Sequence, residues 1–206
     1  MGSRVMHYCI ASLLSDKLSI VNKTDFLLGG IAPDVHYYMN VSKDITHFVD
    51  RDIDGKGHVN YMRFFNKYRA FINQPFYLGY LCHLISDDLW SKDTYFQIVK
   101  DMAKEERKEK LQISYRDFWR LNGRIISAYS LALSNYSVPK DLKIGEINVD
   151  SLPDLYDWIH KDFSYEEHVA REQLELFNDD NSQIIDYIDN SVKRSIHFIS
   201  EHALLS

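Results

Sequence analysis

The sequence predicts an all-α, single-domain fold, a multi-helix bundle spanning residues 1–206 around a buried metal site. Apolar residues recur at helical spacing through most of the chain, capping-box patterns precede two of these stretches, and no stretch alternates as a half-buried strand would. Hydrophobic residues make up 45% of the chain, which is enough to form one core of ordinary domain size.

The expected elements follow from this periodicity. We expect irregular structure over 21–42, where glycines and a proline interrupt the pattern, and a long loop over 135–153. The charged run 104–110 is expected to form a solvated helix face or a helix end. The expected helices are 4–16, 59–72, 75–100, 114–134, 164–177 and 182–203. The last one carries an apolar core stripe made of Ile185, Ile188, Val192, Ile196 and Ile199.

The charge balance limits the classes of partner. The net charge is −6, which argues against binding to duplex nucleic acid, because such a surface carries a basic face. No apolar run reaches the length of a transmembrane helix. Cys9 and Cys82 lie in apolar stretches and are expected to be reduced core thiols. With an N-terminal segment that does not resemble a cleaved signal, these features predict a cytoplasmic protein.

The stretch 78–90, LGYLCHLISDDLW, places two polar residues in an otherwise apolar helix. His83 and Asp87 are four residues apart, so they lie about 40° apart around the helix, with Gly79 leaving room on the same side. A buried carboxylate is costly unless it is paired or binds a metal. The pair is therefore either a hydrogen-bonded core pair or part of a metal site.

Further imidazoles and carboxylates in the first 60 residues favour the metal site. They are His7, Asp34, His36, His47 and His58. Such a set, converging on one helix face, suits zinc or a similar borderline metal. The acidic stretch 50–55, DRDIDG, resembles the opening of a calcium-binding EF-hand loop, but Tyr61 stands where that loop requires Glu. An acidic turn is expected there instead.

Four motifs in order resemble a known family. After the N-terminal helical His7 come FLLGGIAPD at 26–34, THF at 46–48 and LGYLCHLISDDLW. Together they are similar to the zinc-dependent phospholipase C family, which is related to the fungal single-strand-specific zinc nucleases. The resemblance covers roughly residues 1–95, and each motif alone is short. It implies an all-helical domain that binds zinc, with two or more ions and with iron or manganese as alternatives.

The resemblance also implies roles for five residues. Asp34, His47, His83 and Asp87 would hold one metal, and Asp87 would bridge to a second metal that His7 also binds. Asp34 would orient or deprotonate the attacking water.

This chain departs from the family in two ways. Secreted members use their processed N-terminal residue as a ligand, and no cleavage is evident here. The secreted members also use a later set of two histidines and a glutamate for another metal, whereas this chain has no histidine between His83 and His160. Asp93 and Asp117 are candidate substitutes for that set.

These features predict a metal-dependent hydrolase of a small-molecule phosphoester, similar to a phospholipase C or a phosphodiesterase. A metal lowers the pKa of a coordinated water toward neutrality and so supplies a nucleophile. The alternatives are a metallohydrolase acting on an amide or another ester, and a non-enzymatic metal-binding helical domain with a closed site. Tyr37, Tyr38 and Tyr61 are candidates for lining a substrate cleft, and no feature specifies an oligomeric state.

Overall fold

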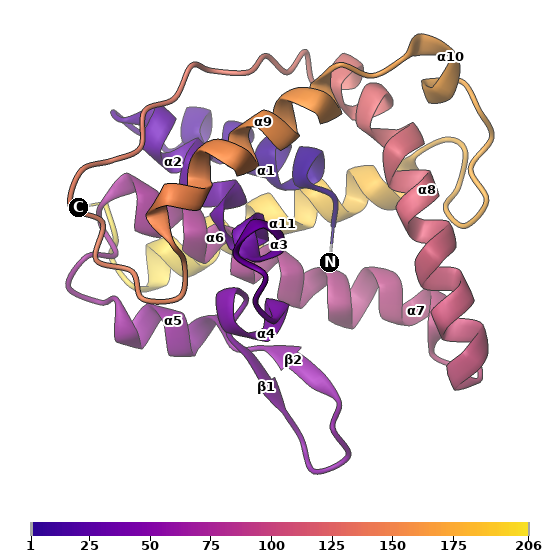
Figure 1. Cartoon of the computed structure of the whole chain (residues 1–206), viewed down its shortest axis with the longest axis horizontal. Coiled ribbons are helices and arrows are strands. Elements are labelled where there is room, and N and C mark those ends of the chain that lie inside the picture. Colours follow the sequence, from indigo (N-terminus) through magenta and orange to yellow (C-terminus); the bar gives the residue numbers. More distant parts are fainter. Residues whose placement is uncertain (1, 206) are drawn as a thin grey trace.

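The computed structural model describes residues 2–205 and has the predicted all-α fold, with one short hairpin of strands added (Figure 1). A 3-10 turn at Ala32–Val35 and a π-helical turn at Trp90–Thr94 interrupt the α-helices. The α-helices are α1 Arg4–Lys17, α2 Lys23–Ile31, α3 His36–Met39, α4 Lys43–Thr46, α5 Tyr61–Lys67, α6 Pro75–Leu89, α7 Tyr95–Val99, α8 Lys104–Ala128, α9 Leu152–Phe163, α10 Glu167–Ala170 and α11 Ser182–Glu201.

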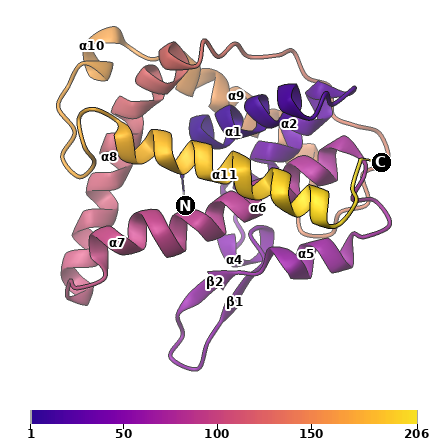
Figure 2. The ribbon, with the colours of Figure 1, turned by 180° about the vertical axis from the view of Figure 1, so that it is seen from behind.

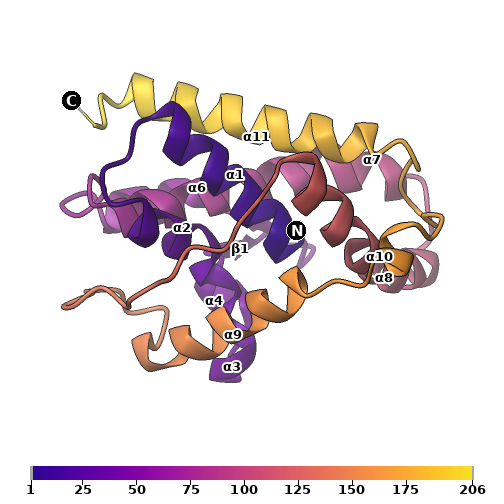
Figure 3. The same cartoon turned by 90° about the horizontal axis from the view of Figure 1, so that it is seen from above.

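Helix α6 lies at the centre of the molecule. All of its residues from Phe76 to Leu89 are buried, as predicted for a helix that is apolar nearly all round. It contacts α1, α2, α5 and α11. From above, α11 lies on one side of α1, α2 and α6, and α9 with α3 lies on the other (Figure 3). The view from behind shows α11 crossing over α6 (Figure 2).

Two glycines bring the backbones of α2 and α6 into contact. A Cβ atom added at Gly29 would lie 2.0 Å from the carbonyl oxygen of Phe76, and one added at Gly79 would lie 2.1 Å from that of Phe26. Any side chain at these positions would force the helices apart. This close approach places the end of α2, and the turn that follows it, against the polar face of α6.

The expectation of irregular structure over 21–42 is wrong, because most of this segment is helical. Asn22 caps α2 by accepting a hydrogen bond from the backbone N–H of Asp25. The glycines serve helix packing rather than ending the helix, and Pro33 lies in the first turn of the 3-10 segment, where its missing N–H is not needed.

The absence of strands was also a wrong prediction. Strands β1 (Val49–Arg51) and β2 (Gly57–Val59) pair antiparallel, with Val49 opposite Val59. Three residues per strand are too few to show alternation in the sequence. The DRDIDG stretch forms the end of β1 and most of the hairpin turn, with Asp52 Oδ1 accepting from the backbone N–H groups of Asp54 and Lys56. It therefore forms the predicted acidic turn.

The predicted helix over 75–100 is confirmed as α6, the π-helical turn and α7 in succession. The next helix begins ten residues earlier than predicted, because the charged run is the first part of α8. The capping-box pattern before the helix predicted at 114 begins with Ser114, which instead lies inside α8, where its hydroxyl donates to the carbonyl of Leu111 at 2.7 Å. A capping pattern can therefore occur within a long helix when the serine bonds to its own preceding turn.

The C-terminal elements divide between confirmed and wrong predictions. Helix α9 begins at the last two residues of the predicted loop, with Pro153 in its first turn, and runs through 154–163, where no element was predicted. The helix predicted over 164–177 is reduced to α10. Helix α11 confirms the prediction for 182–203. Its core stripe is shifted, since Ile185 is 40% exposed and Ile184 and Tyr187 are buried instead.

Two predictions based on composition can be compared with the fold. Within residues 2–205, no helix combines the length and hydropathy needed to cross a membrane. Cys9 and Cys82 are buried and unpaired, as predicted. Burial raises the pKa of each thiol to about 12, so both stay protonated and unreactive.

Candidate metal centre

Five predicted residues from four segments meet beside α6. His7 comes from α1, Asp34 from the 3-10 turn, His47 directly follows α4, and α6 supplies His83 and Asp87. All five are buried, and Asp34 is the most exposed at 7%. The segments are held together by the contact between α2 and α6 and by the packing of α1 against both.

The Nε2 atoms of the three histidines surround the carboxylate of Asp87. His7 Nε2 lies 3.2 Å from Asp87 Oδ1, and His47 Nε2 and His83 Nε2 lie 3.5 and 3.6 Å from Asp87 Oδ2. Two groups of three residues each have ligand atoms within 4.8 Å of one another and could hold a metal ion. They are His7, His83 and Asp87, and Asp34, His47 and His83.

The hydrogen bonds of His7 determine which ring nitrogen carries its proton. The hydroxyl of Ser86 donates to the carbonyl oxygen of His83 at 2.7 Å. Ser86 Oγ can therefore only accept from His7 Nδ1, which lies 3.0 Å away. The proton of His7 is on Nδ1, and the Nε2 lone pair faces Asp87.

The same logic applies to the other two histidines. Thr46 donates its hydroxyl to the carbonyl of Lys43 and so accepts from His47 Nδ1 at 2.9 Å. His83 Nδ1 donates to the carbonyl oxygen of Gly30 at 2.8 Å. His47 Nε2 and His83 Nε2 are then 3.3 Å apart with no proton between them. Two lone pairs this close repel each other unless a cation lies nearby.

Several buried polar atoms of this cluster lack hydrogen-bond partners. Within residues 2–205, His7 Nε2 and both carboxylate oxygens of Asp87 are buried and have no hydrogen bond. A buried carboxylate without donors is strongly unfavourable. Three imidazole nitrogens and a carboxylate that all lack hydrogen fit a metal cation, and oriented Nδ1–H groups are the usual support for histidine ligands.

The protonation states also suit a metal. Burial, followed by the positive charge of Lys43, lowers the pKa of His47 to about 3. Burial raises the pKa of Asp87, but the interaction with the nearby imidazoles of His7 and His83 outweighs burial and holds the pKa well below its usual range. The imidazole of His47 is thus neutral and Asp87 is ionised near neutral pH, as metal ligands require.

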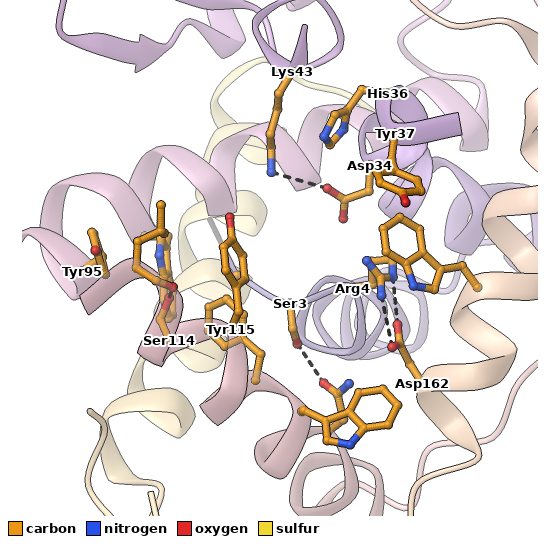
Figure 4. A pocket seen from close by; sticks show the side chains of 17 residues that line it. Ser3, Arg4, Asp34, His36, Tyr37, Lys43, Tyr95, Ser114, Tyr115 and Asp162 are labelled. Atoms are coloured by element: carbon orange, nitrogen blue, oxygen red, sulfur yellow. Dashed lines mark hydrogen bonds and ion pairs between the residues drawn. The ribbon is translucent and has the colours of Figure 1, made fainter. Parts of the chain in front are cut away.

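A cavity of about 550 Å³ opens on one side of the centre. Among the five predicted residues, Asp34 lines it, and His36, Tyr37 and Lys43 lie beside Asp34 (Figure 4). The ring of His36 packs edge-on against that of His47, with centroids 5.5 Å apart, but His36 is outside both groups that could hold a metal. The centre is therefore buried on most sides and accessible from the cavity through Asp34.

Several candidate residues lie elsewhere. The carboxylate of Asp117 is buried and accepts from the backbone N–H groups of residues 175–177, so it anchors that loop and is no substitute ligand. Asp93 is exposed and outside both groups, and His58 is exposed on β2. Of the tyrosines suggested for a substrate cleft, Tyr37 lines the cavity, whereas Tyr38 and Tyr61 do not.

Sequence reasoning missed the residues that orient the ligands. Ser86 and Thr46 are small polar residues inside apolar or helical stretches, and only their position next to a candidate ligand marks them. Lys43 stands one helical turn before His47, a spacing that could have identified it.

The comparisons with known proteins found no relative of this chain. No family model, no curated protein and no solved structure matches the sequence or the fold.

Proposed function

We propose that this chain is a zinc-dependent hydrolase of phosphoesters, of the kind represented by the zinc-dependent phospholipase C family. The observation that carries the proposal is the meeting of three proton-free Nε2 atoms at an unpartnered, ionised Asp87. The order of the motifs FLLGGIAPD, THF and LGYLCHLISDDLW supports the family. The cavity beside Asp34 supports catalysis rather than a purely structural role.

The two oxygens of Asp87 suit two ions. Oδ1 faces His7, while Oδ2 faces His47 and His83, so one carboxylate can bridge separate ions. Asp34, His47 and His83 would complete one ion's ligands, and His7 would bind the other. When bound, the metal would activate a water molecule and neutralise charge on a phosphoryl oxygen.

Asp34 would then act on the substrate side of the centre. Its Oδ1 lies 3.5 Å from His47 Nε2, and its side chain is 10% exposed at the cavity. Although burial raises its pKa, the positive charge of Lys43 holds the pKa of Asp34 well below the usual range. Asp34 is therefore ionised near neutral pH and can orient the attacking water or accept its proton.

The first experiment is elemental analysis of purified protein. We expect about two zinc equivalents per chain in the wild type and a loss of at least one in His83→Ala. His197→Ala is the matched control, because that imidazole is 72% exposed and pairs only with Glu201 among the described residues. Wild-type protein that holds no zinc and takes up none on reconstitution would contradict the proposal.

A closed structural metal site is the second candidate. It is favoured by the depth of His7, His47, His83 and Asp87, each at most 2% exposed. In that case zinc removal would unfold the chain, and the zinc-loaded protein would hydrolyse no ester. Circular dichroism after chelation, together with a phosphoester assay before it, distinguishes the two functions.

A further inference from the structure

Lys43 brings an ammonium group to the accessible side of the metal centre. Its Nζ lies 3.6 Å from Asp34 Oδ1, and both residues line the cavity of about 550 Å³. Figure 4 shows Lys43, His36 and Asp34 along one wall, with Tyr115 and Ser114 across the cavity. The Lys43 side chain is 29% exposed, so a molecule in the cavity can reach the ammonium.

The backbone fixes Lys43 relative to a predicted ligand. The carbonyl oxygen of Lys43 accepts from the N–H of His47 at 2.9 Å and from the hydroxyl of Thr46 at 3.3 Å. The same hydroxyl accepts from the ring of His47. One helical turn therefore fixes the backbone of Lys43 relative to the imidazole of His47.

The N–H groups of the Lys43 ammonium are available to bind a ligand. Within residues 2–205 its ammonium makes no hydrogen bond, and its ionic partner is Asp34. The neighbouring cation on the cavity wall is committed, because Arg4 donates to both carboxylate oxygens of Asp162, at 2.8 and 3.1 Å, and stacks 3.4 Å from the ring of Trp158. Of these two cations on the cavity wall, Lys43 is thus the one whose N–H groups remain available to a ligand.

We propose that Lys43 binds a phosphate oxygen of the substrate and makes the centre selective for phosphoesters over amides and carboxylic esters. This inference rests on the proposed function above. A metal and an ammonium that face the same carboxylate repel each other, and an anion between them removes that repulsion. A phosphoester carries its negative charge throughout the reaction, whereas an amide or a carboxylic ester is neutral when it binds.

The test compares wild-type protein, Lys43→Gln and Lys43→Arg, each loaded with zinc. Calorimetry measures the binding of inorganic phosphate, and kcat and KM are measured for 4-nitrophenyl phosphate and 4-nitrophenyl acetate. We expect Lys43→Gln to bind phosphate about 10- to 100-fold more weakly, as for the loss of a hydrogen bond between charged groups. Its kcat/KM should fall similarly for the phosphoester and change less than about twofold for the acetate. Lys43→Arg should recover part of the phosphate binding.

Lys23→Gln is the matched control, because it removes the same charge at a surface pair with Asp16, away from the cavity lining. Lys43→Gln that keeps its zinc and matches the wild type in phosphate binding and phosphoester hydrolysis would overturn this inference alone. Loss of zinc in Lys43→Gln would overturn it too, since Lys43 would then act by positioning His47. A wild type without zinc and without hydrolysis of either ester would overturn the proposed function and this inference with it.

Discussion

Asp87 is the residue on which the candidate centre depends, because its two oxygens face three different imidazoles. Asp87→Asn keeps the shape of the side chain and removes its charge. We expect zinc content to fall by at least one equivalent and phosphoester hydrolysis to drop more than about 100-fold, with the helical fold retained. Elemental analysis, an activity assay and circular dichroism measure the three effects.

The control for this substitution is Asp93→Asn, which changes an exposed carboxylate just beyond the same helix. It should leave both zinc content and activity unchanged. A fully active Asp87→Asn protein would remove the basis for a catalytic metal at this position.

Ser86 tests whether the orientation of an imidazole matters for metal binding. Ser86→Ala removes the acceptor of His7 Nδ1 and lets that ring turn. We expect zinc affinity to weaken about 10- to 100-fold, as for other groups that support a histidine ligand. Competition with a chromophoric chelator measures this change. Ser15→Ala is the control. The Ser15 hydroxyl also donates to a backbone carbonyl of its own helix, α1, but contacts no ligand. An equal loss of zinc affinity in the two variants would contradict the prediction.

At the scale of elements, the crossing of α2 and α6 sets the distances within the centre. Gly79→Ala would place a Cβ atom 2.1 Å from the backbone carbonyl oxygen of Phe26, which cannot move aside as a side chain could. We expect a loss of about 3 kcal/mol in the free energy of unfolding. Zinc affinity should fall as well, because Gly30, whose carbonyl orients His83, shifts with α2.

Gly145→Ala provides the control, because a Cβ atom at that position meets nothing within 4 Å. Urea denaturation of the two variants should give clearly different midpoints. Equal stability would mean that the α2–α6 contact tolerates a methyl group and does not set the spacing of the centre.

The sequence predicts correctly the elements whose apolar pattern is set by residues close together in the chain. The central helix with His83 and Asp87, and the final helix, were found because their apolar periodicity is long. The glycine-rich segment is helical rather than irregular, because Gly29 is needed for the close contact with α6 and not for a turn among its sequence neighbours. Likewise, local spacing could pair His83 with Asp87. Asp34 and His47 were candidates among several early imidazoles and carboxylates, and only the family resemblance assigned them as ligands, since tertiary packing brings them to the site.

At the scale of the whole molecule, the centre is a buried cluster of charge that metal binding should stabilise. Without metal, the lone pairs of His47 Nε2 and His83 Nε2 face each other at 3.3 Å and oppose folding. Saturating zinc should therefore raise Tm, with a gain that grows with free zinc concentration as expected for a ligand of the folded state. Differential scanning calorimetry with and without chelator measures it, and an unchanged Tm would contradict a metal site.

The metal-free protein should also lose stability in acid within a defined pH window. The pKa of His47 is about 3 in the folded chain and 6.5 in the unfolded chain. Between these values the unfolded chain binds the extra proton, so the free energy of unfolding falls as pH drops from about 6.5 toward 3. Because one proton changes stability by at most about 1.4 kcal/mol per pH unit, urea denaturation at pH 7, 6, 5 and 4 resolves the slope.

The carboxylates act at lower pH and can be separated from this effect. The pKa values of Asp34 and Asp87 lie well below 3.8 in the folded chain, so their contribution is present above about pH 4 and is lost only below it. A fall between pH 6.5 and 5 therefore reports on imidazoles. His47→Gln should reduce the slope in that part of the curve, leaving the contribution of the buried His7, whose pKa is also lowered by burial, whereas the exposed His197→Gln should leave the slope unchanged. A wild-type curve that is flat from pH 7 to 5 would mean that the buried imidazoles accept protons without opposing the fold.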